Sequence, residues 1–124
     1  MNPEKKITSY AFSDTIVLLA NGNGTINFLV DASWKFVAMG WTYAATDIFS
    51  LQILDSDRKI FSNFIPAQAY QGIYATSRVL FTFNKFHPKG YMFNPASNIV
   101  VNLRDTSGSS NTVQIIIDGY RIAV

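Results

Sequence analysis

Hydrophobic and polar residues alternate with a period of two along most of this chain. The clearest alternating segments are Thr25–Val30, Phe49–Ile53, Val79–Asn84, Asn98–Leu103 and Val113–Ile117. Successive side chains of a β-strand point to opposite faces, and β-branched and aromatic residues supply most of the bulk here, so each segment is predicted to be a strand. No long window shows the 3.6-residue period of an amphipathic helix. At most, one helical turn is expected near Ala67–Tyr74.

Turn-forming residues separate these segments. Asn21-Gly22-Asn23-Gly24 follows the apolar run Ile16–Ala20 and is predicted to form a tight hairpin turn, because Asn-Gly tolerates the positive φ angles of such turns. Asp55–Arg58 and Asp105–Asn111 are predicted to separate further strands in the same way, and Asp118-Gly119 to permit a last bend before Tyr120–Val124.

This pattern predicts an all-β fold. About eight short strands without intervening helices are typical of an antiparallel β-sandwich or barrel. We expect a jelly-roll-like sandwich with a long central strand at Trp34–Ala45, and a closed barrel is the alternative. Residues 1–10 are expected to form a loose N-terminal arm, and residues 11–124 a single sandwich domain.

The central strand carries aromatic rings at both parities. Regular alternation places Trp34 and Phe36 on one face, together with Ala38, Gly40 and Thr42. It places Trp41 and Tyr43 on the other face, together with Lys35, Val37 and Met39. The strand is therefore expected to be covered on both sides, or to meet a partner with one of them.

Composition narrows the function classes. The 124 residues are 48% hydrophobic and 15% aromatic but only 15% charged, whereas globular chains average about 25% charged residues. The net charge is +2 and the cations are scattered, so there is no basic stripe to follow the phosphates of a nucleic acid. Cysteine is absent, which excludes disulfides and thiol-ligated zinc.

Membrane insertion and export are not expected. The apolar runs Ile16–Ala20 and Ile115–Ile117 are far shorter than the roughly 20 residues of a spanning helix. The residues after Lys5 and Lys6 do not form the apolar segment of a signal peptide. We expect synthesis and folding in a cytoplasm.

Catalytic and metal-binding residues are hard to find. The single histidine, His87, precedes Pro88 in a loop and is expected to be a solvated side chain. Asp55 and Asp57, with Asp105 from another loop, could supply carboxylate oxygens to calcium, but the EF-hand spacing is missing and two turn aspartates are the simpler interpretation. We expect no enzyme activity, no cofactor and no metal.

The aromatic residues carry most of the functional signal. Tyrosine and tryptophan are enriched at protein interfaces and on sugar-stacking surfaces, since an apolar body comes with a polar tip. One hypothesis is a protein interface formed by Tyr70, Tyr74, Phe86 and Tyr91, with Lys85 and Lys89 at its rim. The alternative is a carbohydrate platform formed by Trp41, Tyr43, Tyr70 or Tyr74, and a third interpretation is that all these rings only pack the fold.

From Trp34 onward the chain resembles the small β-sandwich structural proteins of tailed bacteriophage virions, of the head-associated or decoration type. The resemblance lies in the segment Asp47–Asp55 leading into Arg58–Asn63, and in the C-terminal segments Phe93–Asp105 and Val113–Ile122, which are expected to form a hairpin. It is a pattern of strands and turns rather than a chemical motif, and residues 1–33 do not contribute.

This resemblance implies a virion structural protein, made in the host cytoplasm and incorporated in several copies. Its partners are expected to be capsid or vertex proteins and other copies of itself in a closed homo-oligomer. No membrane and no sequence-specific nucleic acid are expected among its partners. A carbohydrate-binding module for host-surface adsorption is the alternative function, and a small enzyme ranks third.

Overall fold

The structure of this chain is a computed structural model that describes residues 6–56, 58–59, 65–66, 79–80 and 90–124. None of these residues is helical, so the described part of the chain holds no helix able to cross a membrane. The strands are β1 (Ile7–Leu18), β2 (Asn23–Leu29), β3 (Trp34–Ala45), β4 (Phe49–Asp55), β5 (Arg58–Lys59), β6 (Ile65–Pro66), β7 (Val79–Leu80), β8 (Tyr91–Phe93), β9 (Asn98–Asp105) and β10 (Asn111–Ala123).

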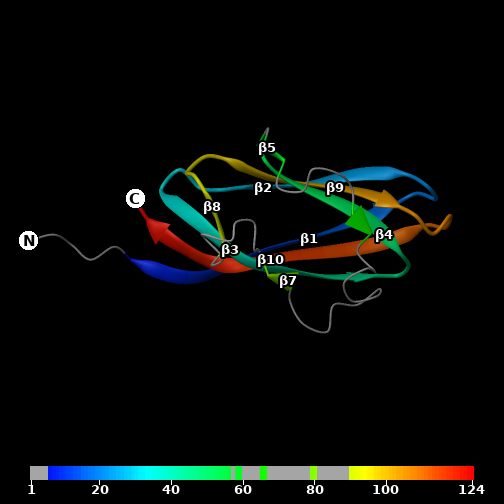
Figure 1. The fold of residues 1–124 in the computed structure, drawn as a ribbon, viewed down its shortest axis with the longest axis horizontal. Helices are drawn as coiled ribbons and strands as arrows, with labels where there is room; N and C mark the ends of the chain where they lie inside the picture. Colours follow the sequence, from blue (N-terminus) through cyan, green and yellow to red (C-terminus); the bar gives the residue numbers. More distant parts are fainter. Residues whose placement is uncertain (1–5, 57, 60–64, 67–78, 81–89) are drawn as a thin grey trace, which may run out of the picture.

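The strands form two antiparallel sheets that are the layers of a sandwich (Figure 1). One sheet has the order β1-β10-β3-β7, with β8 also paired to β3. The other has the order β2-β9-β4-β5, with β6 also paired to β4. Consecutive strands from β1 to β4 therefore alternate between the sheets, as in a jelly roll. The predicted jelly-roll-like sandwich is confirmed, and the closed barrel does not fit two separate sheets.

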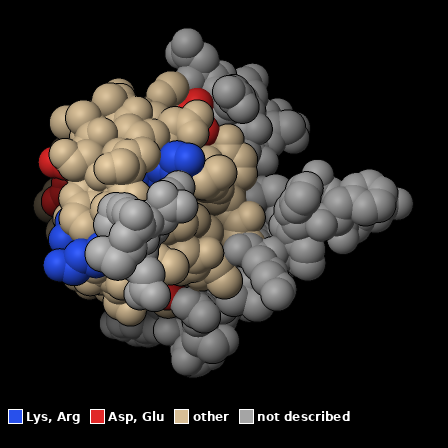
Figure 2. Space-filling view, turned by 90° about the vertical axis from the view of Figure 1, so that its left-hand side faces the viewer, with Lys and Arg blue, Asp and Glu red and all other residues tan. Residues whose placement is uncertain are grey.

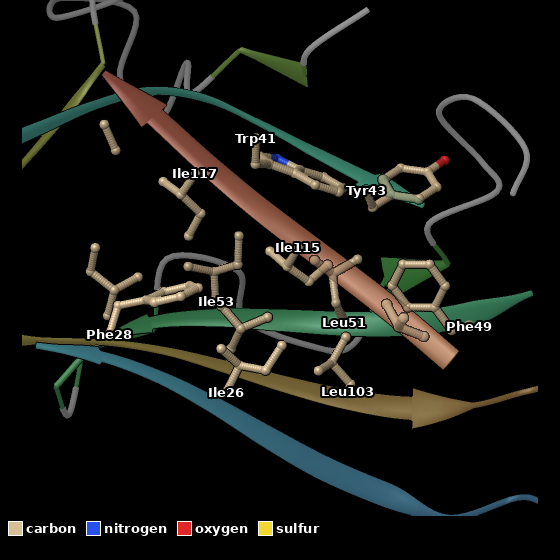
Figure 3. Close-up of a cluster of buried hydrophobic side chains, with 14 of the residues drawn as sticks. Ile26, Phe28, Trp41, Tyr43, Phe49, Leu51, Ile53, Leu103, Ile115 and Ile117 are labelled. Atoms are coloured by element: carbon tan, nitrogen blue, oxygen red, sulfur yellow. The ribbon is translucent and has the colours of Figure 1, made fainter. Parts of the chain in front are cut away.

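The hydrophobic core lies between the two sheets (Figure 3). On the central strands β9, β10 and β4, alternate residues are fully buried, as their period of two predicts. The contributors are Ile99, Val101, Leu103, Val113, Ile115, Ile117, Leu51 and Ile53. At about 25 cal/mol per Å² of apolar surface removed from water, this layer is the main favourable contribution to folding.

Strand β3 contains a β-bulge at Met39. On β10, the consecutive residues Asp118 and Gly119 pair with Gly40 and Ala38, so that Met39 has no partner in this ladder. One extra residue shifts the alternation, and every side chain after it points to the face opposite the expected one. Both halves of β3 therefore direct side chains into the core.

The bulge corrects the predicted division of β3 into two faces. Regular alternation separates Phe36 from Trp41 and Tyr43, but all three belong to the same core cluster. Their exposed fractions are 1%, 0% and 3%. The expectation that these rings divide between two faces of the strand is therefore wrong, because all three pack inward.

Glycine is required where the chain passes this bulge. A Cβ atom on Gly119 would overlap the carbonyl oxygen of Val37. A Cβ atom on Gly90 would lie 2.5 Å from the carbonyl oxygen of Ala38, and its φ of +101° is in any case rare for other residues. The bulge thus depends on close backbone contacts on both sides of β3.

Two expectations about the ends of the chain are wrong. Residues 7–10, assigned to a loose arm, belong to β1 and pair with β10, starting at Ile7 opposite Ile122. The predicted bend at Asp118-Gly119 is absent, since β10 continues through both residues to Ala123. Long cross-strand pairing holds both segments extended. Residues 1–5 lie outside the described part of the chain.

Two predicted hairpins connect different sheets instead. The Asn21–Gly24 turn joins β1 to β2, and the Asp105–Asn111 segment joins β9 to β10, yet the members of each pair lie in opposite sheets. Asn21 does adopt a positive φ of 55°, as an Asn-Gly turn allows. The local turn geometry was predictable, whereas the pairing was not. By contrast, β4 and β5 pair directly across the Asp55–Arg58 turn.

Gly119→Ala should lower the free energy of unfolding by about 1–3 kcal/mol, the usual cost of overpacking, because the new methyl group meets backbone rather than a movable side chain. Gly24→Ala is the matched control, since its Cβ would meet only the side-chain ends of Ile16 and Leu18. Urea denaturation of both variants measures the difference. Equal stability of the two variants would show that the bulge is not closely packed.

Candidate functional site

Two of the proposed sugar-stacking residues are part of the core. Trp41 is fully buried and Tyr43 is 3% exposed. The Tyr43 ring packs edge-on against Phe49 of the opposite sheet, with ring centroids 5.3 Å apart. Neither ring offers a face to a ligand, so the stacking hypothesis is wrong for Trp41 and Tyr43.

Tyr91 of the predicted interface joins the two sheets. It lies on β8, is half-buried against the core, and donates a hydrogen bond of 2.7 Å from its hydroxyl to Asp55 Oδ2. Asp55 ends β4 in the other sheet. This bond uses the polar tip of Tyr91 within the fold. The other proposed interface residues, Tyr70, Tyr74, Phe86, Lys85 and Lys89, lie outside the described residues, as do His87 and Asp57.

Asp55 and Asp105 cannot share an ion. On the paired strands β4 and β9, Asp55 is opposite Ile99, whereas Asp105 is opposite Phe49 at the far end of the ladder. With a rise of about 3.3 Å per residue, the two carboxylates are roughly 20 Å apart. Among the described residues, no group of three potential metal ligands occurs.

Asp105 instead organises the end of the sandwich where β1 meets β2 and β9 meets β10. It is 2% exposed. Its Oδ2 accepts hydrogen bonds from the backbone N–H of Asn21 (2.8 Å) and Gly108 (3.0 Å). Its Oδ1 accepts from the Ser107 N–H (3.1 Å), the Ser107 hydroxyl (2.6 Å) and the Asn111 side-chain amide (3.2 Å).

Asn111 extends this network to the β3–β4 connection. Its fully buried side-chain amide donates to the carbonyl oxygens of Asp47 and Ile48, both at 3.0 Å. Its Oδ1 accepts from the Thr46 hydroxyl and the Asp47 N–H, both at 3.1 Å. Every polar atom of this side chain has a partner, so Asp105 and Asn111 together tie three connections at this end of the fold.

The environment of Asp105 favours its ionised form. Burial by itself raises the pKa of a carboxyl group, but the hydrogen bonds from Ser107, Asn21 and Asn111 outweigh burial and hold the pKa well below its ordinary value of 3.8. All the groups that contact the carboxylate are donors. These hydrogen bonds give the Asp105 carboxylate a structural role, because they tie the connections at this end of the sandwich together.

The opposite end of the sandwich, where β1 begins and β10 ends in Figure 1, contains a pocket. It holds about 280 Å³ of space, part of it open solvent. Its lining residues are Tyr10, Phe12, Leu29, Val30, Asp31, Trp34, Phe36 and Arg121. In Figure 2, which views this end, most of the described surface is neither acidic nor basic.

Arg121 contacts two of the aromatic rings that line the pocket. Its guanidinium carbon lies 4.1 Å from the centroid of the Trp34 ring and 4.6 Å from that of the Tyr10 ring. The register explains these contacts: Tyr10 pairs with Gly119 and Trp34 with Ala123, so both rings are diagonal neighbours of Arg121. Cation–π contacts on two sides hold the guanidinium in one orientation.

Arg121 has unused hydrogen-bonding capacity. Its Nε atom is buried, and no described residue accepts a hydrogen bond from it. No described carboxylate forms an ion pair with it either. Asp31, which lines the same pocket, is exposed and uses Oδ1 to accept a 2.7 Å hydrogen bond from the Ser33 N–H. The pocket is thus lined by the Arg121 guanidinium and the exposed Asp31 carboxylate, which form no ion pair with each other.

Sequence reasoning missed this site. It assigned Tyr10 to a loose arm and treated Arg121 as one of several scattered cations. A signal was nevertheless present, because the period of two that buries Val113, Ile115 and Ile117 continues through Gly119 to Arg121. An arginine on the inward face of a strand is unusual and marks the point where the core ends.

Comparisons with known proteins add little to this picture. No protein-family model matches the sequence, and no curated protein matches it either. Among solved structures, a chain in the structure of infectious bursal disease virus, Gt strain, is similar at a TM-score of 0.31 and 11% sequence identity. The match covers 97% of this chain and 41% of that chain. A likeness this weak assigns neither a fold nor a function.

Asp105→Asn should lower the free energy of unfolding at neutral pH by about 1–3 kcal/mol, because the new amide places its own N–H groups against buried donors. The wild-type protein should also lose stability as the pH falls below 3.8, since a depressed pKa contributes stability above the ordinary pKa that is lost on protonation. Urea titrations at several pH values test both expectations.

The Asp105→Asn variant should show a shallower loss of stability in acid than the wild type. Asp14→Asn serves as the control, because Asp14 is exposed and accepts one described hydrogen bond, from the adjacent Thr15 N–H. Identical pH profiles for wild type and Asp105→Asn would contradict the assigned role of the carboxylate.

Proposed function

We propose that this chain is a non-enzymatic structural protein of a virion and acts by protein–protein assembly. In its more specific form, the proposal is a capsid decoration, vertex or head-associated protein of a tailed phage, made in the host cytoplasm. The jelly-roll strand order supports it, since viral capsid domains are a recurrent use of this architecture. The resemblance of residues 34–124 to phage virion proteins supports it independently.

The observation that carries the proposal is the composition of the pocket end. Trp34, Tyr10 and Arg121 gather there, and these three residue types are the ones enriched at energetic hot spots of protein interfaces. Large apolar side chains are also exposed nearby, with Leu29 at 66% and Val124 at 66%. An apolar and aromatic surface of this kind suits assembly with other virion proteins and with further copies of the chain.

The described polar groups support a structural rather than a catalytic role. Asp105 and Asn111 form their hydrogen bonds with other groups of the fold, and Asp55 accepts a hydrogen bond from the Tyr91 hydroxyl. We therefore propose no catalytic residue, cofactor or metal for this chain. Neither a membrane nor a specific nucleic-acid sequence is among the partners we propose.

A carbohydrate-binding module is the competing function, because lectin domains also use jelly rolls. Sugar recognition needs an open aromatic face. The rings of Trp34 and Tyr10 each have one face covered by the Arg121 guanidinium, which leaves less ring surface for stacking. Assembly is the better match to this geometry.

Mass spectrometry of purified virus particles tests the proposal. The protein should be found in particles that survive a density gradient, in an amount corresponding to several copies per particle. A screen of the isolated protein on a glycan array is the companion measurement. Absence from purified particles, together with specific glycan binding, would replace assembly with the carbohydrate-binding function.

A further inference from the structure

We propose that the Arg121 pocket is the contact between two copies of this chain, with Arg121 of each copy binding Asp31 of the other. The inference rests on the proposed assembly function, and it names a second copy of the chain as the partner and Arg121 and Asp31 as the contacting residues. The resulting dimer has a two-fold axis at the pocket end of the sandwich.

Charge complementarity identifies a second copy as the occupant. In a two-fold interface the same patch meets itself, so each residue type must find its counterpart within one patch. The pocket satisfies this condition with one cation and one anion. Arg121 has no described carboxylate partner, and Asp31 is exposed beside it. Two copies facing each other would form two equivalent ion pairs.

Asp31 is held in position to make this contact. Asp31 lies two residues after the end of β2 at Leu29. The hydrogen bond from the Ser33 N–H to Oδ1 fixes its carboxylate at the start of the β2–β3 turn. Its Oδ2 accepts no hydrogen bond from a described residue. Arg121 is fixed equally well by the two rings, so little side-chain freedom is lost when the copies meet.

An apolar rim surrounds these charges. Leu29 and Tyr10 line the pocket and are 66% and 38% exposed. Val124 is 66% exposed and donates its backbone N–H to the carbonyl oxygen of Ser33, which places it beside the same turn. These side chains can exclude water from the ion pairs, as interface rims do.

The test uses the full chain and measures its mass by sedimentation equilibrium at concentrations up to about 1 mM. The wild type should form a dimer of twice 13.8 kDa. Asp31→Lys places two like-charged pairs at the interface and should raise the dimer Kd roughly tenfold or more. Arg121→Glu should do the same, and circular dichroism establishes which variants remain folded.

Mixing the two variants gives the decisive result. In a mixed dimer, the carboxylate introduced at position 121 of one copy would face the ammonium group introduced at position 31 of the other. The native pair of Asp31 and Arg121 would remain at the second contact. Association should therefore return when Asp31→Lys and Arg121→Glu are combined. The controls Asp14→Lys and Arg104→Glu make the same charge changes at exposed sites outside the pocket and should leave the dimer Kd unchanged.

If Arg121→Glu fails to fold, Asp31→Asn keeps the test intact, because an amide oxygen can still accept from Ser33 while the charge is lost. That variant should also weaken the dimer. A monomeric wild type, or a dimer that is insensitive to Asp31→Lys, overturns the inference. If the protein is nevertheless found in virus particles, assembly stands and its partner at this pocket is another virion protein.

Discussion

Both the core and the candidate site depend on one extra residue in β3. In a regular strand, Trp34 and Trp41 would point to opposite faces of the sheet, because they are an odd number of positions apart. The bulge at Met39 brings both to the inner face, where Trp41 fills the core and Trp34 stacks on Arg121. Gly119 is the matching requirement on β10, since the bulged backbone occupies the space of its side chain.

The two ends of the sandwich differ in how their polar groups are satisfied. At one end, connections cross from sheet to sheet, and their backbone groups need hydrogen-bond partners away from water. Asp105 and Asn111 supply these partners. At the other end, the core reaches the surface through Phe36, Tyr10 and Trp34, and the Arg121 guanidinium covers two of these rings. One end is closed by satisfied polar groups, whereas the other keeps unused binding capacity.

This asymmetry is one reason why we propose an assembly function for this fold. A buried charge without a partner lowers the stability of a fold. Arg121 avoids that cost within the monomer through contact with aromatic rings rather than with a carboxylate. In our proposal, a cation held in this way binds an acidic group of another molecule. Tyr91 differs from Arg121 in this respect, because its hydroxyl donates a hydrogen bond to Asp55 of the other sheet.

The sequence by itself determined the local conformation of this protein, because side-chain period and turn chemistry are properties of a few adjacent residues. The alternation at Val113–Ile117 correctly predicted a strand, and Asn21-Gly22 a turn with positive φ. Only the tertiary structure decided which strands pair, since pairing depends on burial summed over distant segments. Ile7 at one end of the chain pairs with Ile122 at the other, and this ladder carries Tyr10 to the neighbourhood of Arg121.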